Sequence, residues 1–166
     1  MSRKLLMLAA AALLPLSFSA QGAETAKEGS DKLVVHFVNG QSFSPMKQGE
    51  AVVYTGDDYG IQSASAGSLF DNLGVRCVGF VRLEGNKAVG HGYCVKGDKD
   101  GNQYWEAYED VALGKGTAKI VGGLGKFAGM TGDIDYTWDL VSSPDDRVRF
   151  VVSETVRWKL PQQAVN

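Results

Sequence analysis

Residues 75–96 read VRCVGFVRLEGNKAVGHGYCVK. Apolar β-forming residues fill both halves of this stretch, and Gly85 and Asn86 between them are typical of a two-residue hairpin turn. Glycine in the first turn position suits a type II′ turn and makes Glu84 face Lys87. The stretch therefore predicts an antiparallel hairpin whose register can be counted outward from that pair.

The two cysteines of the chain, Cys77 and Cys94, fall opposite each other when the pairs are counted from Glu84 and Lys87. They occupy a non-hydrogen-bonded position, where the Cα atoms of antiparallel strands lie about 4.5 Å apart, a distance that a disulfide can bridge. We predict a Cys77–Cys94 disulfide, which would close a loop of about 16 residues and contribute about 3 kcal/mol. The alternative, a catalytic thiolate, would need an activating base and a reducing environment.

Short apolar runs separated by turn formers continue on both sides of the hairpin, and the best helical alternative is a single turn near residues 68–72. About eight strands joined by short turns predict an all-β fold, a single closed antiparallel β-barrel, because closure removes exposed sheet edges. A β-sandwich is the alternative. The expected strands are Leu33–Val38, Ala51–Thr55, Val75–Glu84, Ala88–Lys96, Tyr104–Leu113, Ala118–Val121, Asp133–Val141 and Arg147–Lys159.

The chain begins like an exported protein. Arg3 and Lys4 precede an apolar run over residues 5–16, and small residues follow at 20–22, which is the layout of a secretory signal peptide. An N-terminal membrane anchor is the alternative, but the run is short of the roughly 20 residues that span a bilayer. We expect a secreted or periplasmic protein without a membrane span after processing. The expected segments are a signal peptide at 1–22, a flexible leader at 23–32, the barrel domain at 33–160 and a tail at 161–166.

Charge and metal-binding residues exclude two classes of function. Lys and Arg total 17 against 19 Asp and Glu, a net charge of −2, which offers no electrostatic surface for nucleic acid. Two cysteines and two histidines cannot build the usual four-ligand zinc site without carboxylates. We expect no metal and no cofactor.

The chain contains 21 glycines, and they are densest in residues 120–132, which read IVGGLGKFAGMTG. A phosphate-binding loop would require a following helix and a Lys-Ser/Thr ending, whereas residues 133–138 alternate like a strand. We expect these glycines to supply positive φ angles and close backbone packing where two strands turn past Phe127.

This motif, GG-x-G-x-F-x-G-x-x-G, resembles the corresponding stretch of plant allene oxide cyclases and dirigent proteins. Residues 54–57, with Gly60-Ile61 and Ala66-Gly67 after them, also look like the cyclase family. The resemblance implies an eight-stranded antiparallel barrel with a hydrophobic cavity, assembly as a homo-oligomer (a trimer), and action on unstable or radical-derived small molecules. Cavity residues cannot be matched one by one, so the cyclase reaction itself does not carry over to this chain.

One carboxylate stands out in the last strand. Glu154 shares a face with Val152, Val156 and other apolar residues. A carboxylate on such a face would be desolvated and have a raised pKa unless it is paired, which is typical of a functional site. The alternative is a structural acid satisfied by a neighbouring Arg or Tyr.

The sequence does not decide which face of the hairpin lies inside the barrel. One face is small, and its glycines would leave room for a ligand or for large side chains from across the barrel. The other face is large, and would make Arg82, His91 and Tyr93 pocket candidates. Glu154, His91 and Tyr93 are therefore the candidates for a catalytic role, His91 as a general base, with a structural or exposed position as its alternative.

Aromatic residues could line a cavity or simply fill the core. The candidates for ligand binding are Arg82 and the aromatic residues Tyr104, Tyr108, Tyr136 and Trp138.

In the strand 133–140, the alternating acids Asp133, Asp135 and Asp139 are expected on a solvated face.

Residues 98–102, DKDGN, look like the start of a calcium loop, but an EF-hand would also need flanking helices. A polar hairpin turn is the better interpretation.

Three functions remain open. The first is non-catalytic binding of a small apolar ligand in the barrel. The second is an isomerase or cyclase in which Glu154 and the tyrosines place charge on a reactive intermediate. The third is a structural or interaction barrel with a filled core.

Overall fold

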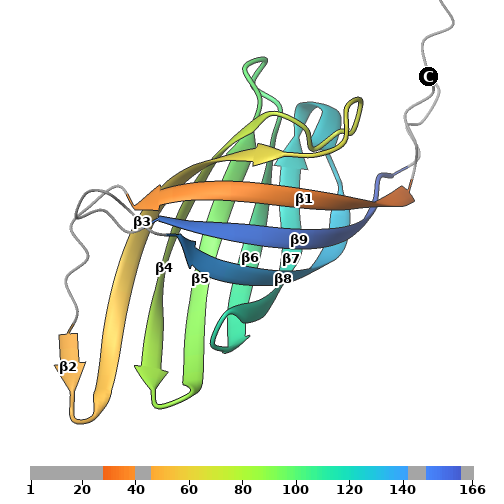
Figure 1. The fold of residues 1–166 in the computed structure, drawn as a ribbon. Helices are drawn as coiled ribbons and strands as arrows, with labels where there is room; N and C mark the ends of the chain where they lie inside the picture. The colour runs from red at the N-terminus through yellow and green to blue at the C-terminus, as the bar shows by residue number, and fades with distance from the viewer. Residues whose placement is uncertain (1–27, 40–45, 142–148, 162–166) are drawn as a thin grey trace, which may run out of the picture.

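The computed structural model describes residues 28–39, 46–141 and 149–161, drawn in colour in Figure 1. Nine strands form one antiparallel sheet in the order β1-β9-β8-β7-β6-β5-β4-β3-β2, and β1 also pairs with β3. That pairing closes an eight-stranded barrel with β2 appended, so the barrel prediction is confirmed over the sandwich. The strands are β1 (Glu28–Asn39), β2 (Met46–Gln48), β3 (Ala51–Ser63), β4 (Leu73–Glu84), β5 (Lys87–Gly97), β6 (Gln103–Ala112), β7 (Lys115–Leu124), β8 (Thr131–Val141) and β9 (Arg149–Lys159).

The predicted signal peptide and most of the predicted tail lie outside the described residues. In the part of the chain that the structure describes, no helix is both long and apolar enough to cross a membrane.

The first strand begins inside the segment that was expected to be a flexible leader, residues 23–32. Strand β1 starts at Glu28, and residues 28–32 pair with β9 from Lys159 back to Thr155. Asp31 accepts hydrogen bonds from the Trp158 indole N–H and the Ser68 hydroxyl, both 2.8 Å long. These residues have no apolar alternation that would predict a strand. Pairing with β9 and the hydrogen bonds of Asp31 hold them in the sheet instead.

The β3 strand is also longer than expected and runs to Ser63. Its second half contains Asp57 and Asp58, which argue against a strand on propensity alone. Cross-strand partners compensate: Asp57 lies beside Arg76, with a 2.9 Å ion pair between the two side chains.

The β4–β5 hairpin has the register that the sequence predicts. Glu84 pairs with Lys87 and Cys77 with Cys94. Gly85 has a φ of 59°, as the first position of a type II′ turn requires. The Cys77–Cys94 disulfide is present, with the two Cα atoms 4.0 Å apart.

One end of the barrel is closed by aromatic side chains. In Figure 1 the β3–β4, β5–β6 and β7–β8 connections gather at this end, at the top of the view. Phe127 lies in a short 3₁₀ helix, η1 (Gly125–Phe127), and is fully buried with Tyr104 and Phe70. The ring centroids of Tyr104 and Phe127 are 5.1 Å apart, and those of Phe70 and Tyr104 are 5.5 Å apart.

The glycine motif shapes this closed end. Gly125 and Gly129 have φ angles of 63° and 72°, a region that favours glycine. A Cβ on Gly123 would overlap the carbonyl of Phe127. The expectation that two strands turn past Phe127 is therefore confirmed.

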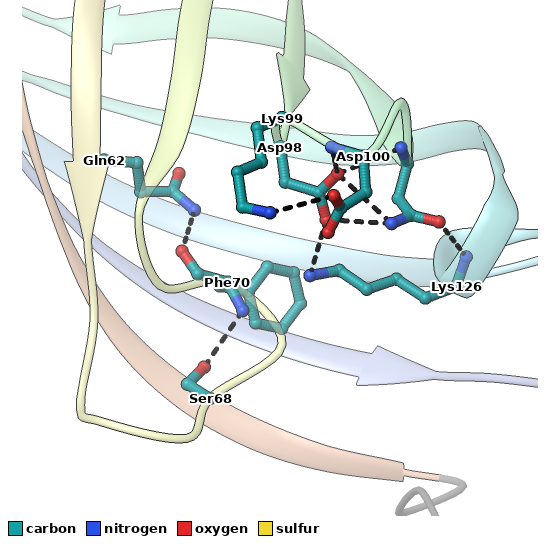
Figure 2. A network of polar contacts seen from close by, with 8 residues as sticks. Gln62, Ser68, Phe70, Asp98, Lys99, Asp100 and Lys126 are labelled. Carbon is teal, nitrogen blue, oxygen red and sulfur yellow. Dashed lines mark hydrogen bonds and ion pairs between the residues drawn. The ribbon is translucent and has the colours of Figure 1, made fainter.

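Residues 98–102 form a polar turn that contacts Lys126 of the 3₁₀ helix η1. Asp98 accepts hydrogen bonds from the backbone N–H groups of Asp100 and Asn102, at 2.9 and 3.1 Å. Figure 2 shows Lys126 reaching across to Asp98, 3.0 Å away. In the same figure, the Gln62 side chain donates a hydrogen bond to the Phe70 carbonyl. Hydrogen bonds from Asn102, with Lys126, hold the pKa of Asp98 below its usual value.

Candidate functional site

The other half of the barrel interior is hollow. A cavity of about 430 Å³ lies inside it, lined by residues from seven of the described strands. Its walls are mostly apolar and aromatic, including Phe37, Tyr54, Tyr108, Trp138 and Phe150. The cavity reaches the surface, because Leu140 lines it while 69% of that residue is exposed. A hollow of about 690 Å³ on the outer wall is lined largely by charged and polar residues and is open to solvent, so the interior cavity is the candidate site.

The floor of the cavity is a buried ionic cluster. Lys96 extends from β5, and its Nζ lies 2.7 and 2.8 Å from the two carboxylate oxygens of Glu154 on β9. The same Nζ lies 2.9 Å from Oε1 of Glu106 on β6. None of these side chains is more than 5% exposed. Beneath them, the Tyr104 ring centroid is 5.8 Å from Nζ, so the cluster separates the filled half from the hollow half.

The cluster contains two carboxyl groups and only one ammonium group, and of the two acids Glu106 has the raised pKa. Burial raises the pKa of Glu106 to about 7, and Lys96 only partly opposes this shift. Its Oε2 atom is buried and has no hydrogen-bond partner among the described residues. Burial alone would lower the pKa of Lys96, but the adjacent charges of Glu106 and Glu154 raise it above its usual value. Lys96 is therefore charged at neutral pH, while Glu106 exchanges its proton near neutrality.

A second acid lies nearer the mouth. Asp110 Oδ1 accepts hydrogen bonds from the Tyr136 hydroxyl at 3.0 Å and from the Trp138 indole N–H at 3.2 Å. Burial raises the pKa of Asp110, and these two donors oppose the rise. Burial and the neighbouring charge of Asp110 also raise the pKa of Tyr136, so the Tyr136 hydroxyl keeps its proton.

Glycines on β4, β5 and β7 make room for these groups. A Cβ on either Gly79 or Gly92 would overlap the Tyr108 hydroxyl, and a Cβ on Gly116 would overlap that of Tyr136. The rings of Tyr108 and Tyr136 meet edge to face, with centroids 6.5 Å apart. The small face of the hairpin is therefore the interior face.

This arrangement decides the place of each predicted site residue. Tyr108, Tyr136 and Trp138 line the cavity, and Glu154 lies at its floor. Glu154 is a paired acid, although its partner is Lys96 rather than the Arg or Tyr that we expected. Tyr104 is fully buried in the closed half and does not line the cavity.

The hairpin candidates lie on the outside of the barrel. Tyr93 is 62% exposed, His91 is exposed, and Arg82 forms a 2.8 Å ion pair with Glu84. The idea that they line a pocket is wrong, because the glycine face must point inward to admit the tyrosines. The acids Asp133, Asp135 and Asp139 are exposed, as expected.

Sequence reasoning missed Lys96, Glu106 and Asp110. A signal was present for each: Lys96 follows Cys94 by two positions on the small face, and the two acids share a face with Tyr104 and Tyr108. Alternation places them inside once that face is known to be interior. Across the described residues, no group of three or more His, Cys, Asp or Glu side chains is placed to hold a metal ion.

No protein-family description matches the sequence, and no curated protein matches it. Among solved structures, the chain is similar to the pterocarpan synthase dirigent protein GePTS1, at 14% identity and a TM-score of 0.49, over 92% of this chain and 98% of that one. It is also similar to the pterocarpan synthase dirigent protein PsPTS1, at 13% identity and a TM-score of 0.48, over 82% of this chain and 99% of that one. The barrel itself rests on the strand pairing described above. That fold is a closed antiparallel barrel, as the resemblance of the glycine motif implies.

Proposed function

We propose that this protein binds a small apolar ligand in the hollow half of its barrel, without catalysis. The observation that supports this most directly is the cavity of about 430 Å³ with largely apolar and aromatic walls. Sites for small molecules in proteins are concave, mostly apolar and about 300–1,000 Å³ in volume, with a few polar groups that orient the ligand. The filled half and the ionic cluster form the floor, so a ligand would enter at the end where Leu140 lies.

The proposal includes export to an oxidising compartment. The buried Cys77–Cys94 disulfide supports this location, because such bonds persist outside the reducing cytosol. Native mass spectrometry of the protein purified from its own host would report a retained ligand. The same spectrum would give the number of chains in the assembly, for which we propose a homo-oligomer.

The binding test uses a neutral apolar fluorophore, N-phenyl-1-naphthylamine, and two tryptophan substitutions on one strand. Val81→Trp adds a large side chain at a position that lines the cavity, whereas Val78→Trp adds it on the outer wall. We expect saturable binding of one probe per barrel, weakened at least about tenfold by Val81→Trp and unchanged by Val78→Trp, because only the first fills the cavity. Absence of saturable binding by the folded wild-type protein, or equal loss in both variants, would contradict the proposal.

A second candidate is an isomerase or cyclase, and the specific observation in its favour is Glu106. A carboxyl group with a pKa of about 7 and one unpartnered oxygen suits general acid–base catalysis near neutral pH. In such a reaction Glu106 would give a proton to one atom of the substrate and recover one from another. Glu106→Gln would then retain probe binding and abolish turnover of a reactive substrate, followed by chromatography of the product. Equal turnover in Glu106→Gln and wild type would remove Glu106 from this role.

A further inference from the structure

We propose that the cavity selects ligands that carry a protonated amine, with the ammonium group at Glu106 and the apolar body among the aromatic side chains. This inference rests on the proposed ligand binding and adds the chemical class of the ligand.

The first argument is the sign of the charges around the cavity. The charged side chains that line it, among the described residues, are all acids: Asp58, Glu106, Asp110 and Glu154. The Lys96 ammonium group is fully buried below the floor, where both Glu106 and Glu154 already contact it. An anionic ligand would bring a further negative charge into this enclosed space, where charges interact more strongly than in water.

The second argument is the unpartnered oxygen of Glu106. Its Oε1 contacts Lys96 at 2.9 Å, while its buried Oε2 has no hydrogen-bond donor in the part of the chain that the structure describes. Glu106 is only 3% exposed and lines the cavity, while its Oε2 atom is buried. A molecule inside the cavity would therefore supply the missing donor once the Glu106 carboxyl group turns toward it. A buried acceptor without a donor is costly, and a charged donor satisfies a carboxylate better than a neutral one.

The third argument is the charge balance of the floor. Two ionised carboxylates and one ammonium group leave one negative charge uncompensated. A ligand ammonium would complete two pairs, whereas an alcohol would supply a hydrogen bond without a charge. Burial is the main cause of the raised pKa values of Tyr108 and Tyr136, and the negative charge of Glu106 adds to both shifts.

The aromatic walls agree with this ligand class. Tyr108 and Tyr136 lie between the acid at the floor and the acid near the mouth, and Trp138 lies beside Asp110. Aromatic faces attract organic cations, and they also pack against the apolar body of a ligand. Because the Tyr136 and Trp138 donors are directed to Asp110, they do not compete for Glu106.

The test compares three ligands that share one apolar body: 4-phenylbutylamine, 4-phenyl-1-butanol and 4-phenylbutyrate. Isothermal titration calorimetry at pH 8 should give the order amine, then alcohol, then carboxylate. We expect at least about a tenfold step between amine and alcohol, as a charged hydrogen bond implies. Glu106→Gln should bring the amine and the alcohol within about threefold of each other, while Asp139→Asn, which removes an acid from the outer wall, should leave the preference intact.

A measurement on the wild-type protein covers the case in which Glu106→Gln does not fold. Because the pKa of Glu106 is about 7, amine binding at pH 7 should release a fraction of a proton and alcohol binding should not. Titrations in two buffers of different ionisation enthalpy measure the number of protons released, from the difference between the two observed binding enthalpies.

The outcomes separate this inference from the binding function. Equal affinity for the three ligands, or a preference for the carboxylate or the alcohol, would overturn the amine class; amine preference without proton release would show that Glu106 is already ionised at pH 7. If N-phenyl-1-naphthylamine still binds in that case, the ligand-binding function stands. If neither that probe nor any of the three ligands binds, both proposals fail.

Discussion

The two halves of the barrel interior are built from the same strands and differ in what fills them. In the closed half, Phe70, Tyr104 and Phe127 are fully buried and pack ring against ring. In the open half, Phe150 and Trp138 are only half-buried and line a cavity of about 430 Å³. The difference arises from the connections: those at the closed end carry large side chains inward, while glycines on β4 and β5 keep the open half hollow.

Under the proposed function, one barrel serves stability and binding in separate places. Dense packing in the closed half stabilises the fold, and the acids and aromatic rings of the open half line the cavity. The Lys96 cluster stands at the boundary and contacts carboxylates from two other strands. We expect substitutions to have different consequences on the two sides of this boundary.

The largest expected difference comes from removing one phenylalanine on each side. Phe127→Ala should lower the free energy of unfolding by about 4 kcal/mol, because it leaves a cavity in a fully packed region. Phe150→Ala should cost about 1–2 kcal/mol, because that ring, stacked on Phe37 at 4.8 Å, already borders an open space. Urea denaturation at pH 7 measures both values, and equal costs would show that the two halves are packed alike.

The disulfide should contribute somewhat less. Replacing both Cys77 and Cys94 by alanine is expected to lower the free energy of unfolding by about 3 kcal/mol, since the bond closes a loop of about 16 residues. A reductant should destabilise the wild-type protein by a similar amount and leave the double variant unaffected. If the double variant unfolds at the wild-type urea concentration, the hollow half is stable without the bond.

The smallest expected effect is the pH dependence that Glu106 confers. Its pKa is raised from 4.5 to about 7 in the folded protein, so the folded state binds more protons than the unfolded state between these values. The free energy of unfolding should therefore fall as pH rises, by about 2 kcal/mol between pH 5 and pH 7. Denaturation at several pH values should show this decrease in wild type and in Phe127→Ala, and its loss in Glu106→Gln. A flat profile in wild type would mean that Glu106 is ionised throughout this range.

Local patterns were enough to predict the hairpin and the barrel. The Gly85-Asn86 turn sets the pairing of its own two strands, so the position of Cys77 against Cys94 follows by counting. The site was harder to predict from the sequence, since Lys96 and Glu154 are 58 positions apart and meet only across the closed barrel. Strand alternation divides residues into two faces, but it does not say which face is interior. For that reason Arg82, His91 and Tyr93 looked like pocket residues and Lys96 did not.

The sequence by itself determined eight of the nine strands in outline, the hairpin register, the disulfide and the corner at Phe127, because turns and period-two alternation act between near neighbours in the chain; it missed β2, the start of β1 and the second half of β3. Only the tertiary structure decided that the glycine face lies inside, that Lys96 pairs with Glu154, and that one oxygen of Glu106 lacks a partner in the described structure. These features depend on closure between β1 and β3, which brings charged side chains from distant strands into one buried space, where they pair with one another.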